Sequence, residues 1–296
     1  MNLKTNGITN LSDLGLLKVE GARAKELLQG QLTCDLNDIS PTQTRLGAHC
    51  NPQGRIISLF RLFYFNQSYY LQMPIDTIPF AENALKKYAA FFKVQLKNVS
   101  DQFIQMGYCG DTLKKYVEIL PDTIDQMVLS NDMLITKIPG GIPRFILIGE
   151  VPAPPYFEKC PHVSPDAWKY LNIRASLSQI YPETIEKFLP HEINLPQLDG
   201  VSFEKGCYTG QEIIARMQYR GKLKTKLVCA SIISDFKPKI GQDIYNECSV
   251  AGSIVDYCDK GDNQYDILAV TNPNDTIYLD PLKKYRIHFI GNNINV

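Results

Sequence analysis

One segment of the 296-residue chain reads Val201-Ser-Phe-Glu-Lys-Gly-Cys-Tyr-Thr-Gly-Gln-Glu-Ile-Ile-Ala-Arg216, and it concentrates residues with chemical function. Gly206 and Gly210 flank Cys207, and glycine tolerates the backbone angles that a tight loop requires. A helix is predicted from near Gly210 to near Gly221, because glycine commonly ends helices. The segment therefore predicts a cysteine in a glycine-hinged loop that leads into a helix.

Cys207 is the candidate reactive residue of this loop. It precedes the predicted helix, and Lys205 stands two residues before it. A helix N-terminus and a nearby ammonium group both favour the thiolate form of a cysteine. Glu212 and Arg216 are four residues apart, so they share a helix face and can form an ion pair. The alternative is a buried structural cysteine in a turn, but the two glycines, the lysine and the charged pair together favour a functional thiol.

The bulk composition is that of an ordinary soluble globular protein, with 44% hydrophobic and 21% charged residues. The 31 basic and 31 acidic residues give a net charge of zero, which gives no general support for a nucleic-acid or membrane-surface protein. No apolar run approaches the roughly 20 residues of a membrane helix. The polar residues 1–12 lack the apolar core of a signal peptide, so we expect a cytoplasmic protein.

The eight cysteines lack the C-x2-C spacing of a zinc site or a redox dithiol. They are Cys34, Cys50, Cys109, Cys160, Cys207, Cys229, Cys248 and Cys258. His49 and Cys50 are adjacent, but no local set offers the three or four ligands that zinc requires. We therefore expect no metal site, and we expect His49 to be hydrogen-bonded within the fold near a pocket.

A hairpin is predicted where two β-prone runs, residues 44–50 and 55–65, flank Asn51-Pro-Gln-Gly54. Proline in the second position and glycine in the fourth are typical of a type I turn. Further strands are predicted at residues 69–73, 133–138 and 144–148, and helices at residues 24–28, 81–92 and from about 166. The proline-rich residues 151–156 cannot sit inside a sheet and are predicted to be a connector.

The chain changes in character after Gly221, where short β-prone runs follow one another with turn residues between them. These runs are residues 227–233, 249–257, 267–270, 277–279 and 285–290. Such spacing is typical of a small β-barrel. The sequence therefore predicts an α+β body over residues 1–225 and a C-terminal β-barrel over residues 226–296.

The motif Lys-Gly-Cys-Tyr-x-Gly-Gln-Glu-x-x-x-Arg at residues 205–216, continued by Tyr-Arg-Gly at 219–221, resembles the signature of the YgfZ family. Residues 28–35, 48–55 and 190–203 also resemble family segments. The resemblance is weakest over about residues 101–163 and after 227. It implies a three-subdomain, aminomethyltransferase-like folate-binding fold, in which two intertwined α/β subdomains and a small C-terminal β-barrel surround a central pocket.

The resemblance also implies a function. Family members bind tetrahydrofolate or another reduced folate and support the assembly, repair or activity of iron–sulfur enzymes, including a methylthiotransferase that modifies tRNA. Cys207 matches the residue on which family function is thought to depend, and we expect its thiol at the mouth of a pterin-sized cavity. The rest of the motif is matched by Lys205, Gly206, Tyr208, Gly210, Gln211, Glu212 and Arg216. We expect a monomer whose partners are folate and iron–sulfur client enzymes.

Trp168 matches a folate-contacting tryptophan of the family, and an indole can stack on a flat pterin or aminobenzoate ring. An ordinary core tryptophan is the equally weighted alternative. A second family tryptophan is replaced by Leu14, and the family's Ala-Gly-x-Pro is Ala-Ser-Leu-Ser at residues 175–178.

The aminomethyltransferases carry an acidic pair in the strand after the hairpin, where this chain has Ser58 and Leu59. Neither residue can act as a charged base. The resemblance therefore favours an accessory protein without turnover of its own, and a tetrahydrofolate-dependent aminomethyl or one-carbon transferase is the alternative.

A basic run follows the motif and comprises Arg216, Arg220, Lys222, Lys224 and Lys226. A solvated face is the first interpretation of this run, and anchoring of the glutamate tail of folate is the second. Direct binding of tRNA is the least expected, because the chain as a whole is neutral.

Overall fold

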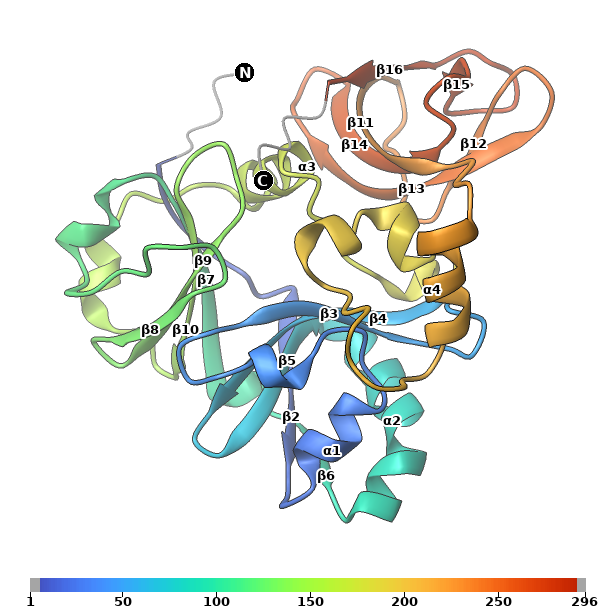
Figure 1. Cartoon of the computed structure of the whole chain (residues 1–296). Coiled ribbons are helices and arrows are strands. Elements are labelled where there is room, and N and C mark those ends of the chain that lie inside the picture. Colours follow the sequence, from blue (N-terminus) through green and yellow to red (C-terminus); the bar gives the residue numbers. More distant parts are fainter. Residues whose placement is uncertain (1–5, 292–296) are drawn as a thin grey trace.

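The computed structural model describes residues 6–291 and contains two five-stranded sheets and a closed barrel (Figure 1). The first sheet has the strand order β3-β4-β5-β2-β6, and the second has the order β1-β7-β10-β9-β8. The barrel closes in the order β11-β14-β13-β12-β15-β16. The predicted α+β body with a β-barrel after it is confirmed.

The two helices of the first sheet pack against the same face of it. Its strands are β2 (Leu14–Glu20), β3 (Arg45–Cys50), β4 (Ile56–Phe65), β5 (Ser68–Pro74) and β6 (Gln95–Asn98), and its helices are α1 (Ala24–Gln29) and α2 (Ile78–Phe92). Helix α2 buries Ile78, Ala81, Leu85 and Ala89, which recur at helical spacing and face the sheet. The two helices lie side by side below the sheet in Figure 1, and the predicted helices at 24–28 and 81–92 are confirmed.

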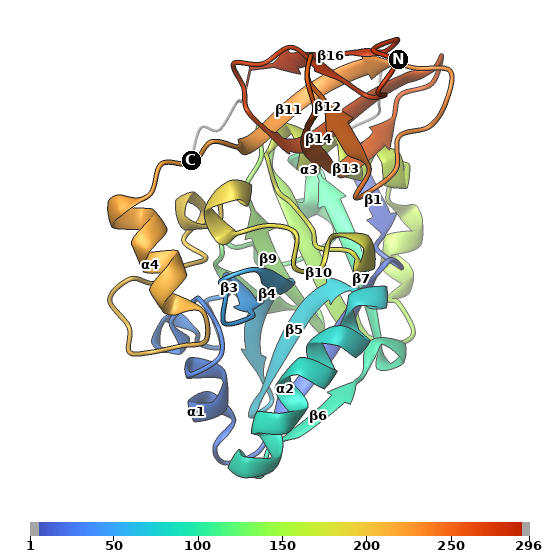
Figure 2. The same cartoon turned by 90° about the vertical axis from the view of Figure 1, so that its right-hand side faces the viewer.

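The second sheet is built from β1 (Gly7–Asn10), β7 (Phe103–Cys109), β8 (Met127–Ser130), β9 (Met133–Ile138) and β10 (Arg144–Glu150). Helix α3 (Pro165–Arg174) follows it and contacts both β1 and the barrel strand β13. Ser164 caps this helix, because its side chain accepts a 3.1 Å hydrogen bond from the backbone N–H of Ala167. In Figures 1 and 2, α3 lies between the second sheet and the barrel.

The barrel strands are β11 (Lys226–Ile233), β12 (Asp243–Tyr245), β13 (Val250–Asp259), β14 (Gln264–Thr271), β15 (Ile277–Tyr278) and β16 (Arg286–Ile290). Pairing of β16 with β11 closes the barrel, so no edge strand is left unpaired. Its interior is filled by a separate apolar cluster that includes Ile232, Ile244 and Ile267. The sequence predicted five of these strands and missed the three-residue β12.

The segment between α3 and the barrel holds short 3-10 helices and α4 (Gln211–Arg220), which lies at the outer edge of the molecule in Figure 2. The 3-10 helices of the chain are η1 (Leu36–Asp38), η2 (Ile75–Thr77), η3 (Ser100–Gln102), η4 (Thr112–Lys115), η5 (Pro155–Lys159), η6 (Pro182–Thr184), η7 (Pro190–Ile193) and η8 (Pro196–Leu198). Among the described residues, no helix is long and apolar enough to cross a membrane.

A buried ion pair connects the two sheets. Arg61 of β4 donates a hydrogen bond to the carboxylate of Asp125, which precedes β8, and Arg61 also donates to the hydroxyl of Thr44 at 3.0 Å. The backbone N–H of Thr44 in turn donates to the carbonyl of Asp125 at 2.8 Å. Arg61 is 6% exposed, so its charge depends on this partner.

Replacement of Asp125 by asparagine should lower the free energy of unfolding by about 3 kcal/mol, because it leaves a buried guanidinium without a counter-ion. Asparagine tolerates the left-handed backbone of this position, where φ is 64°. The matched control is Asp262→Asn, an exposed aspartate with φ of 53°. Urea unfolding measures the effect, and a loss below about 0.5 kcal/mol would show that the pair does not stabilise the fold.

Candidate functional site

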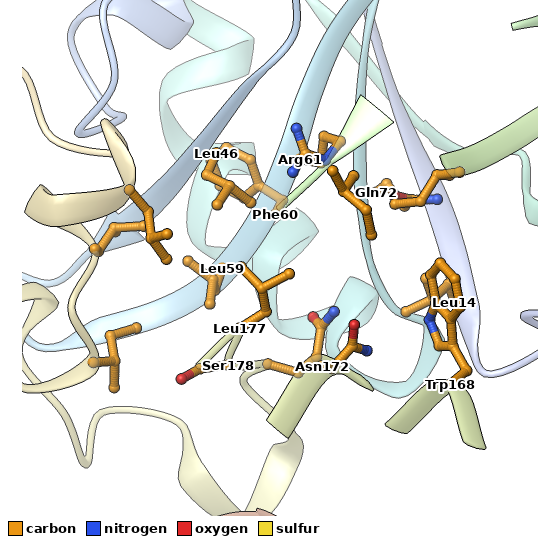
Figure 3. Close-up of a pocket in the computed structure, with 16 residues that line it drawn as sticks. Leu14, Leu46, Leu59, Phe60, Arg61, Gln72, Trp168, Asn172, Leu177 and Ser178 are labelled. Carbon is orange, nitrogen blue, oxygen red and sulfur yellow. The ribbon is translucent and has the colours of Figure 1, made fainter. Parts of the chain in front are cut away.

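A cavity lies where the two sheets, α3 and the segment 177–198 meet (Figure 3). Its lining residues are mainly apolar, with Leu14, Leu59 and Ile146 from the sheets and Leu195 from the segment. The volume of the cavity is about 60 Å³, which is small for a drug-sized ligand. A folate ring would therefore need some of these side chains to shift on binding.

Trp168 forms one wall of the cavity and is 5% exposed. Its ring packs directly on Gly107 of β7, where a Cβ atom would lie 2.8 Å from ring carbons. The guanidinium of Arg144 lies 5.3 Å from the centre of the ring. Leu14 lies beside Trp168 in Figure 3. The position that the resemblance assigned to a second tryptophan thus still contributes an apolar wall.

Leu59 lines the cavity, whereas Ser58 is buried and is not among the lining residues. The wall facing the cavity at this position of β4 is therefore apolar, and it offers no group to take up or release a proton. The polar lining comes instead from Arg61, Gln72 and Asn172, together with Ser178 and Gln179.

Cys207 is exposed on the loop before α4. This agrees with an accessible thiol, but Cys207 is not among the residues that line the cavity. The expectation that the thiol lies at the cavity mouth is therefore not met in this structure. The cavity and the thiol are two separate features, connected by the segment 190–206.

Lys205 anchors the cysteine loop to the segment that follows α1. Its ammonium donates hydrogen bonds to the carbonyls of Leu32 and Cys34, both at 2.9 Å. Burial lowers the pKa of Lys205 to about 8, against the opposing attraction of Cys34 and Asp35. The sequence assigned this lysine to the thiol, whereas the structure shows that its hydrogen bonds go to backbone carbonyls.

Gly210 is the hinge of the loop, with φ of 84°. A Cβ atom there would lie 2.7 Å from the carbonyl oxygen of Asn51, so the tip of the predicted hairpin packs directly against this residue. The hairpin turn itself is confirmed by a 2.9 Å hydrogen bond from the N–H of Gly54 to the carbonyl of Asn51. Gly206 differs, because its φ is not positive and a Cβ atom would meet nothing within 4 Å.

The remaining motif residues have different surroundings. Tyr208 is buried against the first sheet, and its hydroxyl has no hydrogen-bond partner among the described residues. Gln211 begins α4, where its N–H donates to the carbonyl of Tyr208 at 3.1 Å. Glu212 and Arg216 are both exposed. Within the described part of the chain they form no ion pair, so the predicted pairing is wrong.

His49 is buried in β3 and does not line the cavity. Burial lowers its pKa to about 4, and the charge of Lys87 adds to this effect. Its Nδ1 atom has no hydrogen-bond partner among the described residues, so the expected hydrogen bond is not formed at this atom. Residues 6–291 contain no cluster of three or more side chains that could hold a metal ion.

Sequence reasoning missed four polar residues of the cavity, namely Arg61, Gln72, Asn172 and Gln179. A signal for two of them was present. Asn172 is four residues after Trp168 on one helix, so both lie on the same face. Gln72 is a polar residue between Leu71 and Met73 in a fully buried strand, and such residues need a partner.

Iodoacetamide should modify only Cys207 and Cys248 in the native protein, because these are the two exposed thiols. The other six are buried, and burial raises the pKa of Cys34, for example, to about 12. Peptide mapping by mass spectrometry identifies the modified residues, with Cys207→Ala as the matched variant that should keep only the Cys248 adduct. An unmodified Cys207 in the native wild type would contradict an accessible thiol.

No protein-family model matches the chain. It is 31% identical over 229 residues to the tRNA-modifying protein YgfZ of Colwellia psychrerythraea, which covers 75% of this chain and 70% of that protein. The chain is also 30% identical over 264 residues to the tRNA-modifying protein YgfZ of Vibrio atlanticus. This match covers 87% of this chain and 81% of that protein.

The glycine cleavage system aminomethyltransferase T of Bartonella henselae has a similar structure, with a TM-score of 0.75 over 97% of this chain and 86% of that one. The identity in this superposition is 15%, so it shows the fold. The chain has an aminomethyltransferase-like fold, and by its sequence it belongs to the family of the tRNA-modifying protein YgfZ.

Proposed function

We propose that this protein binds a reduced folate in the cavity beside Trp168 and supports iron–sulfur enzymes that modify tRNA, with Cys207 as its reactive thiol. The observation that carries the proposal is a largely apolar cavity with one indole wall and a few polar side chains. That combination is typical of sites for flat heteroaromatic ligands. The relatives are named tRNA-modifying proteins, which supports a role in that process.

The thiol takes a separate role in this proposal. Cys207 faces solvent, and the loop that carries it is fixed by Lys205 and by the contact of Gly210 with the hairpin. An exposed thiol on an anchored loop is suited to contact a macromolecular partner. The folate would then be held in the cavity, while the cysteine meets an iron–sulfur client such as a tRNA methylthiotransferase. A monomeric, cytoplasmic protein is part of the same proposal.

The second candidate function is one-carbon transfer from tetrahydrofolate, which the aminomethyltransferase-like fold favours. It requires a group that assists the transfer at the reacting carbon, and Leu59 lines the cavity wall at the position where the resemblance places an acid. General acid–base assistance contributes about 10²–10⁴-fold to such reactions. Without that group, binding is the better supported activity.

Tetrahydrofolate should change the fluorescence of Trp168, which is the single tryptophan of the chain, in an anaerobic titration. Calorimetry should then show that Trp168→Ala weakens the binding of tetrahydrofolate about 10-fold to 100-fold, because stacking on an aromatic side chain contributes about 1–3 kcal/mol. Phe91→Ala is the control, since Phe91 is an aromatic residue that is 75% exposed on α2. Absence of binding to the wild type would remove the folate part of the proposal.

Deletion of the gene in its host should lower the amount of methylthiolated tRNA and the activity of iron–sulfur enzymes. The wild-type gene and a Cys248→Ala variant should restore both, whereas Cys207→Ala should not, because Cys207 is the exposed thiol of the anchored loop and Cys248 lies elsewhere. Nucleoside analysis of tRNA by mass spectrometry measures the effect. Full restoration by Cys207→Ala would exclude the thiol from the mechanism.

A further inference from the structure

Three side-chain amides line the cavity with Trp168, and two of them, Gln72 of β5 and Asn172 of α3 (Figure 3), are held by hydrogen bonds to other side chains. An amide can present either its oxygen or its nitrogen to a ligand, and its hydrogen-bond partners determine which. Gln72 is hydrogen-bonded to Gln105, and Asn172 is hydrogen-bonded to Arg144. These partners determine which polar atom of each amide remains for the cavity.

The orientation of Gln72 follows from a backbone carbonyl. The carbonyl of Leu14 can only accept, and the side-chain nitrogen of Gln105 donates to it at 2.9 Å. The oxygen of Gln105 is therefore directed to Gln72, whose Nε2 donates to it at 2.7 Å. All three residues are buried. The remaining polar atom of Gln72, Oε1, is left as a hydrogen-bond acceptor.

The orientation of Asn172 follows from a buried cation. The guanidinium of Arg144 can only donate, and its Nη1 donates to Oδ1 of Asn172 at 2.8 Å. Its Nε and Nη2 atoms both donate to the carbonyl of Pro139. Burial lowers the pKa of Arg144 to about 9, which still leaves it cationic at neutral pH. The Nδ2 group of Asn172 is therefore left as a donor, and it has no partner among the described residues.

We infer that the cavity selects its ligand by hydrogen-bond polarity, with Gln72 accepting from an N–H group and Asn172 donating to a carbonyl on the edge of a ring that lies against Trp168. This inference rests on the proposed folate site and names the part of the ligand that is recognised. A 2-amino-4-oxo pterin carries N–H groups at N3 and the 2-amino substituent, and a carbonyl at C4. A 2,4-diamino ring has the opposite polarity at C4 and N3.

The test compares tetrahydrofolate with its 4-amino counterpart, tetrahydroaminopterin, by anaerobic calorimetry. The two ligands differ only at the substituent on C4 and the attached ring proton. The wild type should bind tetrahydrofolate about 10-fold to 100-fold more tightly, because each mismatched buried polar group weakens binding by about 1–3 kcal/mol.

Asn172→Asp is the decisive variant, because aspartate has the same shape and keeps an oxygen for the guanidinium of Arg144. Its second oxygen replaces the donor with an acceptor. The preference for tetrahydrofolate should then fall at least about tenfold or reverse. Asn274→Asp, in an exposed loop of the barrel, makes the same chemical change away from the cavity and should leave the preference unchanged.

Three outcomes separate the inference from the function on which it rests. A preference that falls in Asn172→Asp and persists in Asn274→Asp supports the selection by polarity. Binding of both ligands with the same ratio in the wild type and Asn172→Asp overturns the inference while leaving the folate site in place. Failure of both ligands to bind the wild type overturns the folate site and the inference together.

Discussion

The ion pair between Arg61 and Asp125 is the contact on which the arrangement of the cavity depends. Arg61 belongs to β4, where Leu59 and Phe60 also line the cavity, and Asp125 lies just before β8 of the second sheet. A buried guanidinium without a counter-ion is strongly unfavourable, so the two sheets are held at this point. The cavity is lined by both sheets, by α3 and by the segment 177–198.

The same principle, a buried cation satisfied by oxygen atoms, recurs at two other positions. Lys205 donates hydrogen bonds to two carbonyls of the segment that follows α1 and thereby fixes the loop of Cys207. Arg144 binds Asn172 and the carbonyl of Pro139, and so fixes part of the cavity wall. Each cation joins segments that are distant in the sequence. These buried cations therefore hold separate segments in position. The loop of the exposed thiol and the wall of the cavity both depend on them.

The sequence predicted the features that depend on neighbouring residues. The hairpin turn at Asn51–Gly54, helix α2 and most of the barrel follow from local turn chemistry and periodicity. The contacts around the cavity could not be predicted in this way, because they join residues that are far apart in the sequence. Arg61 and Asp125 are 64 residues apart, and Gln105 lies 91 residues from Leu14, whose carbonyl it contacts. The role of Lys205 was missed for the same reason, since its partners are more than 170 residues earlier in the chain.

The cavity wall combines an apolar surface with a few fixed polar groups. General acid–base assistance needs a group that takes up or releases a proton during the reaction, and Leu59 cannot supply one. Gln72 and Asn172 are neutral amides that hold one orientation, because a carbonyl and a guanidinium behind them permit no other. Such fixed donors and acceptors recognise a ligand without reorganising, which strengthens binding and gives specificity. A site of this kind is suited to hold a folate while chemistry takes place elsewhere, and Cys207, outside the cavity, is the exposed thiol of the anchored motif loop that is available for it.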